Sequence, residues 1–338
     1  MRQAWVTRHG GPEVLQVREA PDPPVGEGEV RIRVAAAGVN FADVLARIGL
    51  YPDAPKPPCV LGYEVAGEVD AVGPGEDGFR VGDRVLAITH FGGYASTVVE
   101  PAMQVVPLPA GLDFPRAAAI PVNYMTAWLM LVRMGNVQAG EQVLVRSAAG
   151  GVGQAAVQIC RLRGASVIGT ASPSKHERLR QSGVAHCLDY RQEDLVAEVR
   201  RLTGGRGVDI ALDAVGGRSF RDSYRCLAPL GRLMVFGMSS FAPGRRRRLL
   251  AILKGLYGTP RFHPMSLINR NRGVFGLNIG HLWQQAGLLR TMLDEIVRLT
   301  AAGTFDPVVD RAFPLEGAGD AHAYLQERKN FGKVILTP

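Results

Sequence analysis

A run of small residues near the middle of the chain has the composition of a phosphate-binding turn. Residues 142–147 (QVLVRS) are typical of a buried strand and lead directly into residues 148–153 (AAGGVG), after which apolar residues recur at helical spacing. Gly150 would let the backbone approach a pyrophosphate, and Gly153 would let the following helix pack closely on the strand. The free amides at the start of that helix would hold the anion. This strand, turn and helix context predicts a dinucleotide-binding turn, with a glycine-rich turn that binds nothing as the alternative.

The residues expected near the adenosine ribose favour NADP(H) over NAD. An NAD site has a carboxylate about twenty residues after the first glycine position, and residues 168–172 (IGTAS) contain none. Its absence removes repulsion toward a 2′-phosphate. Ser172, Lys175 and Arg178 follow at once, and Tyr190 follows the next predicted strand. These groups could bind the phosphate, although each cation could also belong to a solvated helix face.

Predicted strands and helices alternate around this turn, which indicates βαβ units and a parallel sheet. Strands are predicted at residues 142–147, 166–170, 209–213 and 233–236, and helices at residues 152–163 and 175–182. Before residue 121 the pattern is different, with short alternating segments at residues 29–37, 64–72, 84–89 and 94–99. A further helix is predicted at residues 287–302. The fold class is therefore α/β, with a doubly wound parallel sheet and a β-rich module.

Composition limits the classes of protein to consider. A chain of 338 residues is long enough for about two domains. The four cysteines have no C-x-x-C spacing, so neither a disulfide framework nor a zinc knuckle is predicted, and a reducing cytoplasm is the expected compartment. No uncharged apolar run has the length of a membrane span. The net charge of +8 favours anionic partners without choosing among them, and no motif indicates nucleic-acid binding.

Several motifs spread over the chain carry a family resemblance. They are residues 9–15 (HGGPEVL), 38–43 (GVNFAD), 49–52 (GLYP), 62–64 (GYE), 81–85 (VGDRV), 148–153 and 332–336 (GKVIL). Together they resemble the zinc-independent quinone oxidoreductase group of the medium-chain dehydrogenase/reductase superfamily. Residues 236–240 (FGMSS), the basic insert after them and residues 271–280 (NRGVFGLNIG) are most similar to the vesicle amine transport protein branch of that group.

The resemblance implies two domains and one cofactor. Residues 1–121 and 281–338 would form a GroES-like catalytic domain, and residues 122–280 a Rossmann domain that binds NADPH. The cofactor would lie in the cleft between them. The resemblance also implies a homodimer.

Carried over position by position, the resemblance implies a set of cofactor contacts. Those near the nicotinamide would be Asn40, Tyr51 and Thr126, those at the pyrophosphate Gly150, Gly151 and Val152, and those around the 2′-phosphate Ser172, Lys175 and Tyr190. The remaining contacts would be Val215, Phe236, Gly237, Met238, Ser239, Leu277, Asn278 and Arg328.

No metal site is expected. The zinc-dependent relatives have a cysteine and a histidine where this chain has Asn40 and Tyr63, and they also have a four-cysteine loop that it lacks. An amide and a phenol are poor zinc ligands beside thiolate and imidazole. Alcohol oxidation, which needs a Lewis acid to help deprotonate the hydroxyl, is then disfavoured. The expected reaction is hydride transfer from NADPH to a quinone or an α,β-unsaturated carbonyl compound.

Two residues are the candidates for catalysis. Hydride transfer leaves negative charge on a carbonyl oxygen, which calls for a hydrogen-bond donor. Tyr51 is the first candidate, and its alternative role is to close over the cofactor as a wall. Asn40 could orient the carboxamide or hold the substrate carbonyl, or it could only form an Asx turn. Tyr63 is expected to line the substrate pocket with Phe91 and Met125, and Asp43 is expected to be a buried structural partner.

The insert after residue 240 predicts a basic amphipathic helix. Arg245–Arg248 precede apolar residues at spacings of three and four between residues 249 and 257. This helix could be an ordinary one that covers the cleft with its cations solvated, which is compatible with a lid that shapes a large hydrophobic pocket. It could instead contact a lipid surface, or, with Arg261, Arg270 and Arg272 nearby, bind a substrate that carries phosphate or coenzyme A. Two alternative functions follow: an enoyl-thioester reductase, and a lipid-associated cofactor-binding protein with little catalysis.

Overall fold

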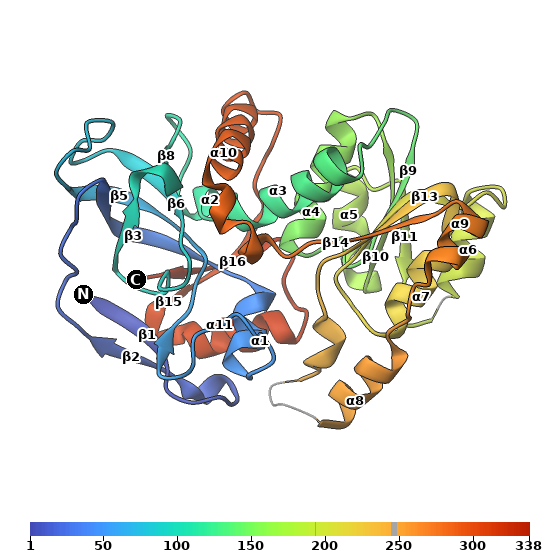
Figure 1. Cartoon of the computed structure of the whole chain (residues 1–338), viewed down its shortest axis with the longest axis horizontal. Helices are drawn as coiled ribbons and strands as arrows, with labels where there is room; N and C mark the ends of the chain where they lie inside the picture. Colours follow the sequence, from blue (N-terminus) through green and yellow to red (C-terminus); the bar gives the residue numbers. More distant parts are fainter. Residues whose placement is uncertain (193, 245–248) are drawn as a thin grey trace. The chain divides into compact units, whose positions relative to one another are not determined.

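The computed structural model describes residues 1–192, 194–244 and 249–338 (Figure 1). The chain divides into two compact units. The first contains Met1–Met125, Gly244 and Ile279–Pro338, and the second contains Thr126–Pro243 and the segment from Leu249 to Asn278. Among the described residues, no helix combines the length and the apolar character that crossing a bilayer requires.

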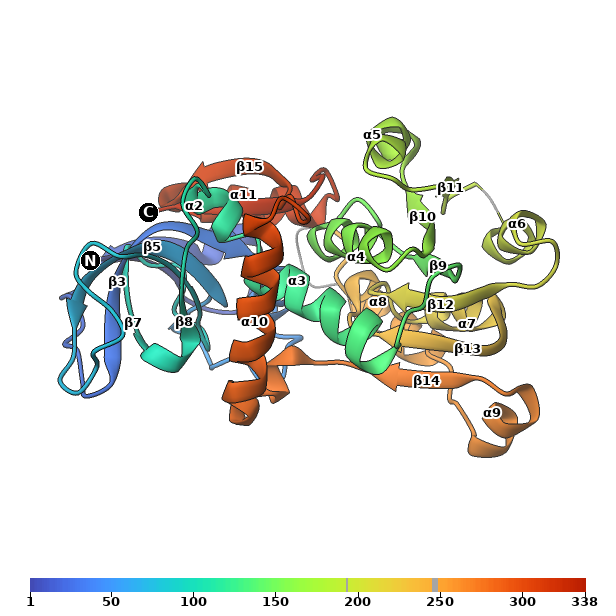
Figure 2. The same cartoon turned by 90° about the horizontal axis from the view of Figure 1, so that it is seen from above.

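The second unit is built on a parallel sheet of six strands. Their spatial order is β11-β10-β9-β12-β13-β14, which can be followed from top to bottom in Figure 2. The strands are β9 (Gln142–Val145), β10 (Ser166–Ala171), β11 (His186–Asp189), β12 (Val208–Asp213), β13 (Leu227–Val235) and β14 (Gly273–Gly276). The chain fills the sheet outward from β9 to one side and then outward from β12 to the other. The carboxyl ends of β9 and β12 therefore flank the point where the winding reverses, which is where open α/β sheets bind their ligands.

Helices connect these strands, as the alternating pattern predicts. They are α4 (Gly151–Leu162), α5 (His176–Gln181), α6 (Leu195–Leu202), α7 (Arg218–Arg225), α8 (Leu249–Gly258) and α9 (Pro264–Arg270). Apolar residues of the strands, such as Leu144 and Ile168, pack with Val199 of α6 in one buried cluster. Strand β9 is two residues shorter than predicted because the chain already turns at Ser147, whose φ is +59°. The predicted helix at residues 175–182 begins as the 3-10 turn Pro173–Lys175.

The first unit contains two sheets. A seven-stranded sheet has the order β15-β16-β3-β5-β6-β8, with β7 also paired to β3, and a smaller sheet has the order β2-β1-β4. The strands are β1 (Arg2–Val6), β2 (Leu15–Glu19), β3 (Glu29–Val39), β4 (Cys59–Val60), β5 (Glu64–Val72), β6 (Arg84–Ile88), β7 (Thr97–Pro101), β8 (Val105–Pro107), β15 (Val309–Pro314) and β16 (Lys333–Thr337). Ile335 of β16 is opposite Gly38 of β3. The strand β16 therefore joins the sheet that the N-terminal strands of the first unit form.

The predicted strand at residues 94–99 is wrong at its beginning. The strand β7 starts only at Thr97. Tyr94 instead donates its backbone N–H to the carbonyl of Leu61, and its own carbonyl accepts from the N–H of Ala4. These bonds tie residue 94 to the smaller sheet, so it does not continue the ladder of β7.

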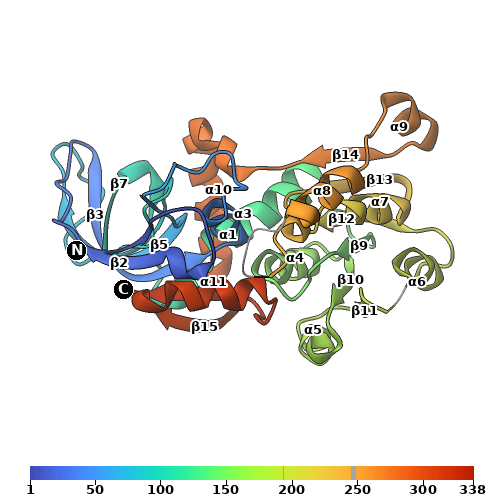
Figure 3. The ribbon, with the colours of Figure 1, turned by 90° about the horizontal axis from the view of Figure 1, so that it is seen from below.

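Four helices belong wholly to the first unit: α1 (Phe41–Arg47), α2 (Phe114–Ala117), α10 (Ala286–Ala301) and α11 (Ala318–Gln326). Helix α10 matches the predicted helix within a residue at each end, and its buried side chains are the apolar ones that define its spacing, including Leu289, Met292 and Ile296. Helix α11 lies against β15 and β16 (Figure 3). Helix α3 (Pro121–Trp128) runs from the first unit into the second.

Candidate active site

The turn after β9 has the geometry of an anion cradle. The first amides of α4 have no intrahelical acceptors, and its N-cap, Gly150, has no side chain that could accept from them. A Cβ at Gly153 would lie 2.5 Å from the carbonyl oxygens of both Ser147 and Ala148, so only glycine fits there. Gln154 fixes the turn from inside, because its Nε2 donates to the Ala148 oxygen at 2.9 Å. The residues present therefore fit a pyrophosphate at this helix terminus.

Ser172, Lys175 and Tyr190 follow two adjacent strand ends. In the parallel register Ala171 of β10 is opposite Asp189 of β11, so Ser172 and Tyr190 leave the sheet side by side. No carboxylate occurs in residues 172–175. The carboxylate of Asp189 is buried and accepts the backbone N–H of Arg191 at 3.1 Å. The carboxyl ends of β10 and β11 are thus followed by residues with hydroxyl and ammonium groups.

A buried carboxylate, that of Asp213, shapes the next part of the edge. Its Oδ1 accepts the Val215 N–H at 2.8 Å, and its Oδ2 accepts the hydroxyls of Ser219 and Ser223, each at 2.6 Å. The resulting loop holds the segment after β13, since the Ser239 N–H donates to the Ala214 oxygen at 3.0 Å. Sequence reasoning missed Asp213, although serines six and ten residues after it were a readable signal.

Most of the predicted cofactor contacts follow the carboxyl ends of the six parallel strands. They are Gly150, Gly151 and Val152 after β9, Ser172 and Lys175 after β10, Tyr190 after β11, Val215 after β12, Phe236, Gly237, Met238 and Ser239 after β13, and Leu277 and Asn278 after β14. Thr126 is buried in α3. Arg328 belongs to the first unit, in the turn after α11, with a φ of +56°.

A mostly apolar hollow lies in the first unit. It brings together the two predicted catalytic residues, Asn40 and Tyr51. It is lined by Asn40, Ala42, Tyr51, Tyr63, Ile88, Pro121, Val122, Met125, Ile279, Gly280, Trp283 and Leu289. Phe91 is not among the lining residues but packs on the Tyr63 ring, with ring centroids 4.9 Å apart.

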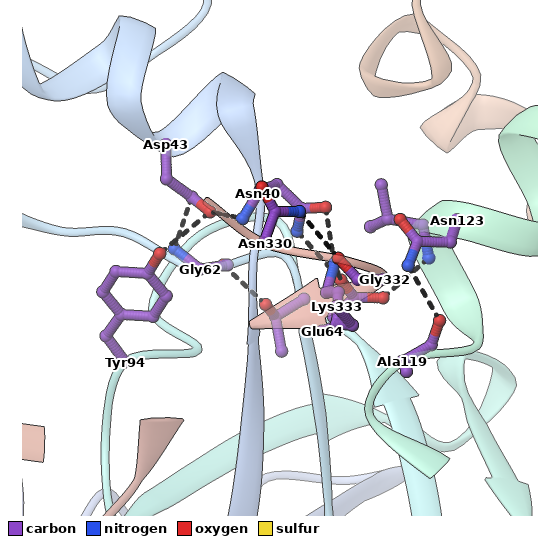
Figure 4. Close-up of polar contacts among 12 residues, drawn as sticks. Asn40, Asp43, Gly62, Glu64, Tyr94, Ala119, Asn123, Asn330, Gly332 and Lys333 are labelled. Atoms are coloured by element: carbon purple, nitrogen blue, oxygen red, sulfur yellow. Dashed lines mark hydrogen bonds and ion pairs between the residues drawn. The ribbon is translucent and has the colours of Figure 1, made fainter. Parts of the chain in front are cut away.

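The amide of Asn40 is fixed by a buried ion pair (Figure 4). Its Nδ2 donates to Glu64 Oε1 at 2.9 Å, and its Oδ1 accepts from Lys333 Nζ at 2.7 Å. Lys333 also pairs directly with Glu64, whose Oε2 accepts the Val122 N–H at 2.7 Å. The side chains of Lys333 and Glu64 are 2% and 0% exposed, so the two charges compensate each other away from water. Because one amide atom faces a cation and the other an anion, the orientation of the amide is determined.

Glu64 and Lys333 belong to two of the motifs that carry the family resemblance, but the sequence did not predict a role for either residue. They are 269 residues apart in the chain and lie on β5 and β16. No local spacing could predict that they pair. The pairing depends on the sheet, in which β3 separates the two strands.

Asp43 is the buried structural partner that the sequence predicts. Its carboxylate accepts the N–H of Asn40 at 2.8 Å, the N–H of Gly62 at 3.1 Å and the hydroxyl of Tyr94 at 3.0 Å (Figure 4). Burial raises the pKa of this carboxyl group to about 7, while these hydrogen bonds oppose the rise. Its bond to the Asn40 N–H caps α1, so Asp43 positions the residue that lines the hollow.

Tyr63 is held as a neutral phenol. Burial, and after it the nearby negative charge of Asp43, raises its pKa far above the usual range. The Tyr51 ring meets the Tyr63 ring edge-on, with centroids 6.4 Å apart. A neutral phenol and an amide already bonded to Lys333 are not a donor set that zinc would choose. Among the described residues, no three His, Cys, Asp or Glu side chains gather in a group that could hold a metal ion.

Comparisons with known proteins agree with this architecture. Residues 26–110 match the family model of the alcohol dehydrogenase GroES-like domain, and residues 182–336 match that of the zinc-binding dehydrogenases. The chain is 40% identical over 339 residues to the synaptic vesicle membrane protein VAT-1 homolog of Danio rerio, covering 99% of this chain and 70% of that protein. It is 36% identical over 348 residues to a quinone oxidoreductase of Pseudomonas aeruginosa, covering 98% of this chain and 97% of that protein.

Solved structures of the same two groups of proteins have the same fold as this chain. The quinone oxidoreductase of Escherichia coli, solved in complex with NADPH, superposes with a TM-score of 0.88 at 31% identity, covering 100% of both chains. The human VAT-1 homolog-like protein superposes with a TM-score of 0.87 at 34% identity, covering 100% of this chain and 98% of that one. These matches confirm the predicted GroES-like and Rossmann folds. The chain is therefore a member of the medium-chain dehydrogenase/reductase family of oxidoreductases, in the branch that contains the quinone oxidoreductases and the VAT-1 homologues.

Proposed function

We propose that this protein is an NADPH-dependent, zinc-independent reductase of quinones or α,β-unsaturated carbonyl compounds. The observation that carries the proposal is the edge of the parallel sheet in the second unit. There a glycine cradle follows β9 and a carboxylate-free segment follows β10. The E. coli quinone oxidoreductase, whose fold this chain shares, was solved in complex with NADPH.

The residues have separate parts in this reaction. Bound NADPH would supply a hydride. The turn at Gly150–Gly153 would bind the pyrophosphate, and Ser172, Lys175 and Tyr190 would bind the 2′-phosphate. Tyr51 would donate a hydrogen bond to the carbonyl oxygen on which negative charge develops. The ion pair of Glu64 and Lys333 would keep the Asn40 amide in one orientation beside the same hollow.

Cofactor choice gives a first prediction. Lys175→Ala is expected to raise the dissociation constant of NADPH about tenfold or more while leaving that of NADH nearly unchanged, because a cation beside a 2′-phosphate contributes only to NADPH binding. Arg180→Ala, on the helix α5 that follows Lys175, is the control and should change neither constant. Fluorescence titration measures both. Equal losses for the two cofactors would remove the assigned role of Lys175.

Turnover tests the proposal itself. Purified protein should oxidise NADPH in the presence of free enones or quinones, followed at the nicotinamide absorption band. Tyr51→Phe is expected to lower kcat by about 100-fold with little change in the NADPH dissociation constant, since it removes one donor to the developing charge. Tyr257→Phe, at a side chain that is 94% exposed, is the control. Unchanged kinetics in Tyr51→Phe would leave Tyr51 as a wall of the hollow.

The same assay distinguishes the proposed reductase of quinones and free enones from the alternative, an enoyl-thioester reductase. Crotonyl-coenzyme A and a free enone of similar reactivity are compared as substrates. A preference for the thioester would replace quinones and free enones by thioesters as the substrate class, and a preference for the free enone supports the proposal as stated.

A second candidate function is association with a lipid surface, and the exposed apolar face of α8 favours it. Leu249, Leu250, Leu253 and Leu256 are each more than 60% exposed, whereas Gly255 packs against Phe241. The predicted basic segment Arg245–Arg248 lies outside the described residues. The VAT-1 homolog of Danio rerio is named a synaptic vesicle membrane protein.

Flotation with vesicles tests this candidate. The protein should float with vesicles that contain anionic lipid, and the double variant Leu250→Ser, Leu253→Ser should lose most of this binding, because it removes apolar area that would enter the interface. Replacing Arg245–Arg248 by alanine should weaken binding to anionic vesicles. Leu230→Ser, at a side chain that is 76% exposed, is the control. Equal flotation of all variants would contradict a role for this face.

A further inference from the structure

The carboxylate of Asp43 belongs to a buried network that the proposed chemistry has not yet used. Its Oδ2 accepts the Tyr94 hydroxyl at 3.0 Å, and the same hydroxyl lies 3.0 Å from Nε2 of His322. Asp43, on α1, Tyr94, before β7, and His322, on α11, are each 0% exposed, and together they form the Asp43 network. The network leads to Asn40, because Asp43 Oδ2 also accepts the Asn40 N–H at 2.8 Å.

The imidazole of His322 carries a single ring hydrogen. Burial, and after it the nearby guanidinium of Arg47, lowers the pKa of His322 well below its usual value, so the ring is neutral. Its Nδ1 is buried and has no hydrogen-bond partner among the described residues. A hydrogen on Nδ1 would thus lack an acceptor, whereas a hydrogen on Nε2 is donated to the Tyr94 oxygen. The ring hydrogen therefore belongs on Nε2, and the Tyr94 hydroxyl donates to Asp43.

The number of hydrogens in the Asp43 network favours an ionised carboxylate. Two hydrogens, one from Tyr94 and one from His322, fill the two hydrogen bonds that join the three side chains. The other partners of the carboxylate are the N–H groups of Asn40 and Gly62, which can only donate. Protonation of Asp43 would add a third hydrogen, for which the network has no acceptor. Because an unpaired buried donor is costly, Tyr94 and His322 oppose that protonation.

The charges around the network act on Asp43 in both directions. Burial raises the pKa of Asp43 to about 7, while the hydrogen bonds from Asn40 and Tyr94 and the charge of Lys333 oppose the rise. Burial, and after it the charge of Asp43, raises the pKa of Tyr94 well above its usual value, so this phenol stays neutral. The other titratable groups that interact with the network or with its neighbours are Arg47 on α1, Tyr63 before β5, Glu64 on β5 and Glu13, whose charge acts on Arg47.

A change of charge on Asp43 affects the hollow through Asn40, which is the N-cap of α1 and lines the hollow. An ionised carboxylate is a stronger acceptor for the Asn40 N–H than a neutral carboxyl group. We propose that Tyr94 and His322 are positioning residues, which keep Asp43 ionised and thereby hold Asn40 at the wall of the hollow. This assignment rests on the proposed function, because it concerns the placement of a candidate catalytic residue of that reaction.

The backbone amide of Asn40 reports the charge on Asp43 without any turnover. The full-length protein, labelled with ¹⁵N-asparagine, is titrated from about pH 6 to about pH 9.5 and followed by ¹H–¹⁵N NMR. The Asn40 signal is expected to shift with a midpoint at about pH 7 in the wild type. In Tyr94→Phe the midpoint should move to about pH 8 or above, since the carboxylate loses a hydrogen bond that the neutral form needs less.

Two further variants test the physical reason. His322→Gln should also raise the midpoint, because the amide oxygen of glutamine can accept the third hydrogen that histidine cannot. Tyr324→Phe is the matched control: it too removes a tyrosine hydroxyl from an aspartate, Asp310, at 2.8 Å, but outside the network. The Asn40 midpoint of this control should equal that of the wild type.

The pH dependence of turnover gives a second readout. Since the ionised form of Asp43 holds Asn40, kcat for NADPH-dependent enone reduction should fall in the wild type as the pH decreases through about 7. With its midpoint about one pH higher, Tyr94→Phe should have a kcat about threefold below the wild type at about pH 7.5 and nearly equal to it above about pH 9, with little change in the KM for NADPH. Damage to the fold would not be reversed by alkaline pH.

Two results would overturn the assignment: an Asn40 signal that does not titrate in this range, or equal midpoints in Tyr94→Phe and the wild type. If Tyr94→Phe does not fold, a wild-type midpoint in His322→Gln has the same meaning. A raised Asn40 midpoint in Tyr94→Phe without NADPH oxidation by the wild type would support the action of the network on Asn40 and refute the reductase, so the two failures are distinguishable.

Discussion

Lys333→Met is expected to lower the free energy of unfolding by about 3–5 kcal/mol, the cost of leaving one charge of a buried pair without its partner. The side chain of Glu64 is 0% exposed, so water cannot replace the lost ammonium. The Asn40 oxygen loses its donor in the same change. Urea denaturation followed by circular dichroism measures the effect.

Two further variants test the physical reason. Glu64→Gln combined with Lys333→Met removes both charges and should recover much of the lost stability. Lys329→Met breaks the surface ion pair with Glu327, whose nitrogen and oxygen are 2.7 Å apart, and should cost less than about 1 kcal/mol. A double variant as unstable as Lys333→Met alone would show that shape or hydrogen bonding, and not the unpaired charge, dominates.

Gly153→Ala is the change expected to affect cofactor binding most. Its Cβ would lie 2.5 Å from two backbone carbonyl oxygens, and backbone cannot move aside as a flexible side chain can. The start of α4 would have to shift away from the turn that we propose binds the pyrophosphate. If the strain of about 1–3 kcal/mol that overpacking causes is relieved in the free protein and restored on binding, the NADPH dissociation constant rises about 5- to 150-fold.

Fluorescence titration with NADPH measures this change, with the thermal midpoint recorded beside it. Gly287→Ala is the control, since a Cβ at Gly287 has nothing within 4 Å. Wild-type affinity in Gly153→Ala would mean that α4 does not need its close approach to the turn, and the cradle would lose its main support.

The strand, turn and helix at the proposed cofactor site were predictable because their signals are local. Strand, turn and helix follow one another within residues 142–163, and the register of a parallel sheet brings separate strand ends to one edge. The interior of the first unit was much less predictable. Glu64 and Lys333 meet only because β16 pairs with β3, and Tyr94 leaves its expected strand for bonds to Leu61 and Ala4. Such contacts depend on tertiary packing between distant residues, and no local pattern in the sequence predicts them.

The return of β16 to the first sheet also has a consequence for biosynthesis. Glu64 is synthesised early, but the ammonium that neutralises it, that of Lys333, is added 269 residues later. Until β16 is synthesised, residues 37–39 of β3 lack that partner strand and the carboxylate of Glu64 lacks its ammonium. The uninterrupted segment of the second unit, from Thr126 to Pro243, contains the first five strands of that sheet, β9 to β13. Vectorial folding would therefore allow the first five strands of the Rossmann sheet to pair before β16 can join the sheet of the first unit.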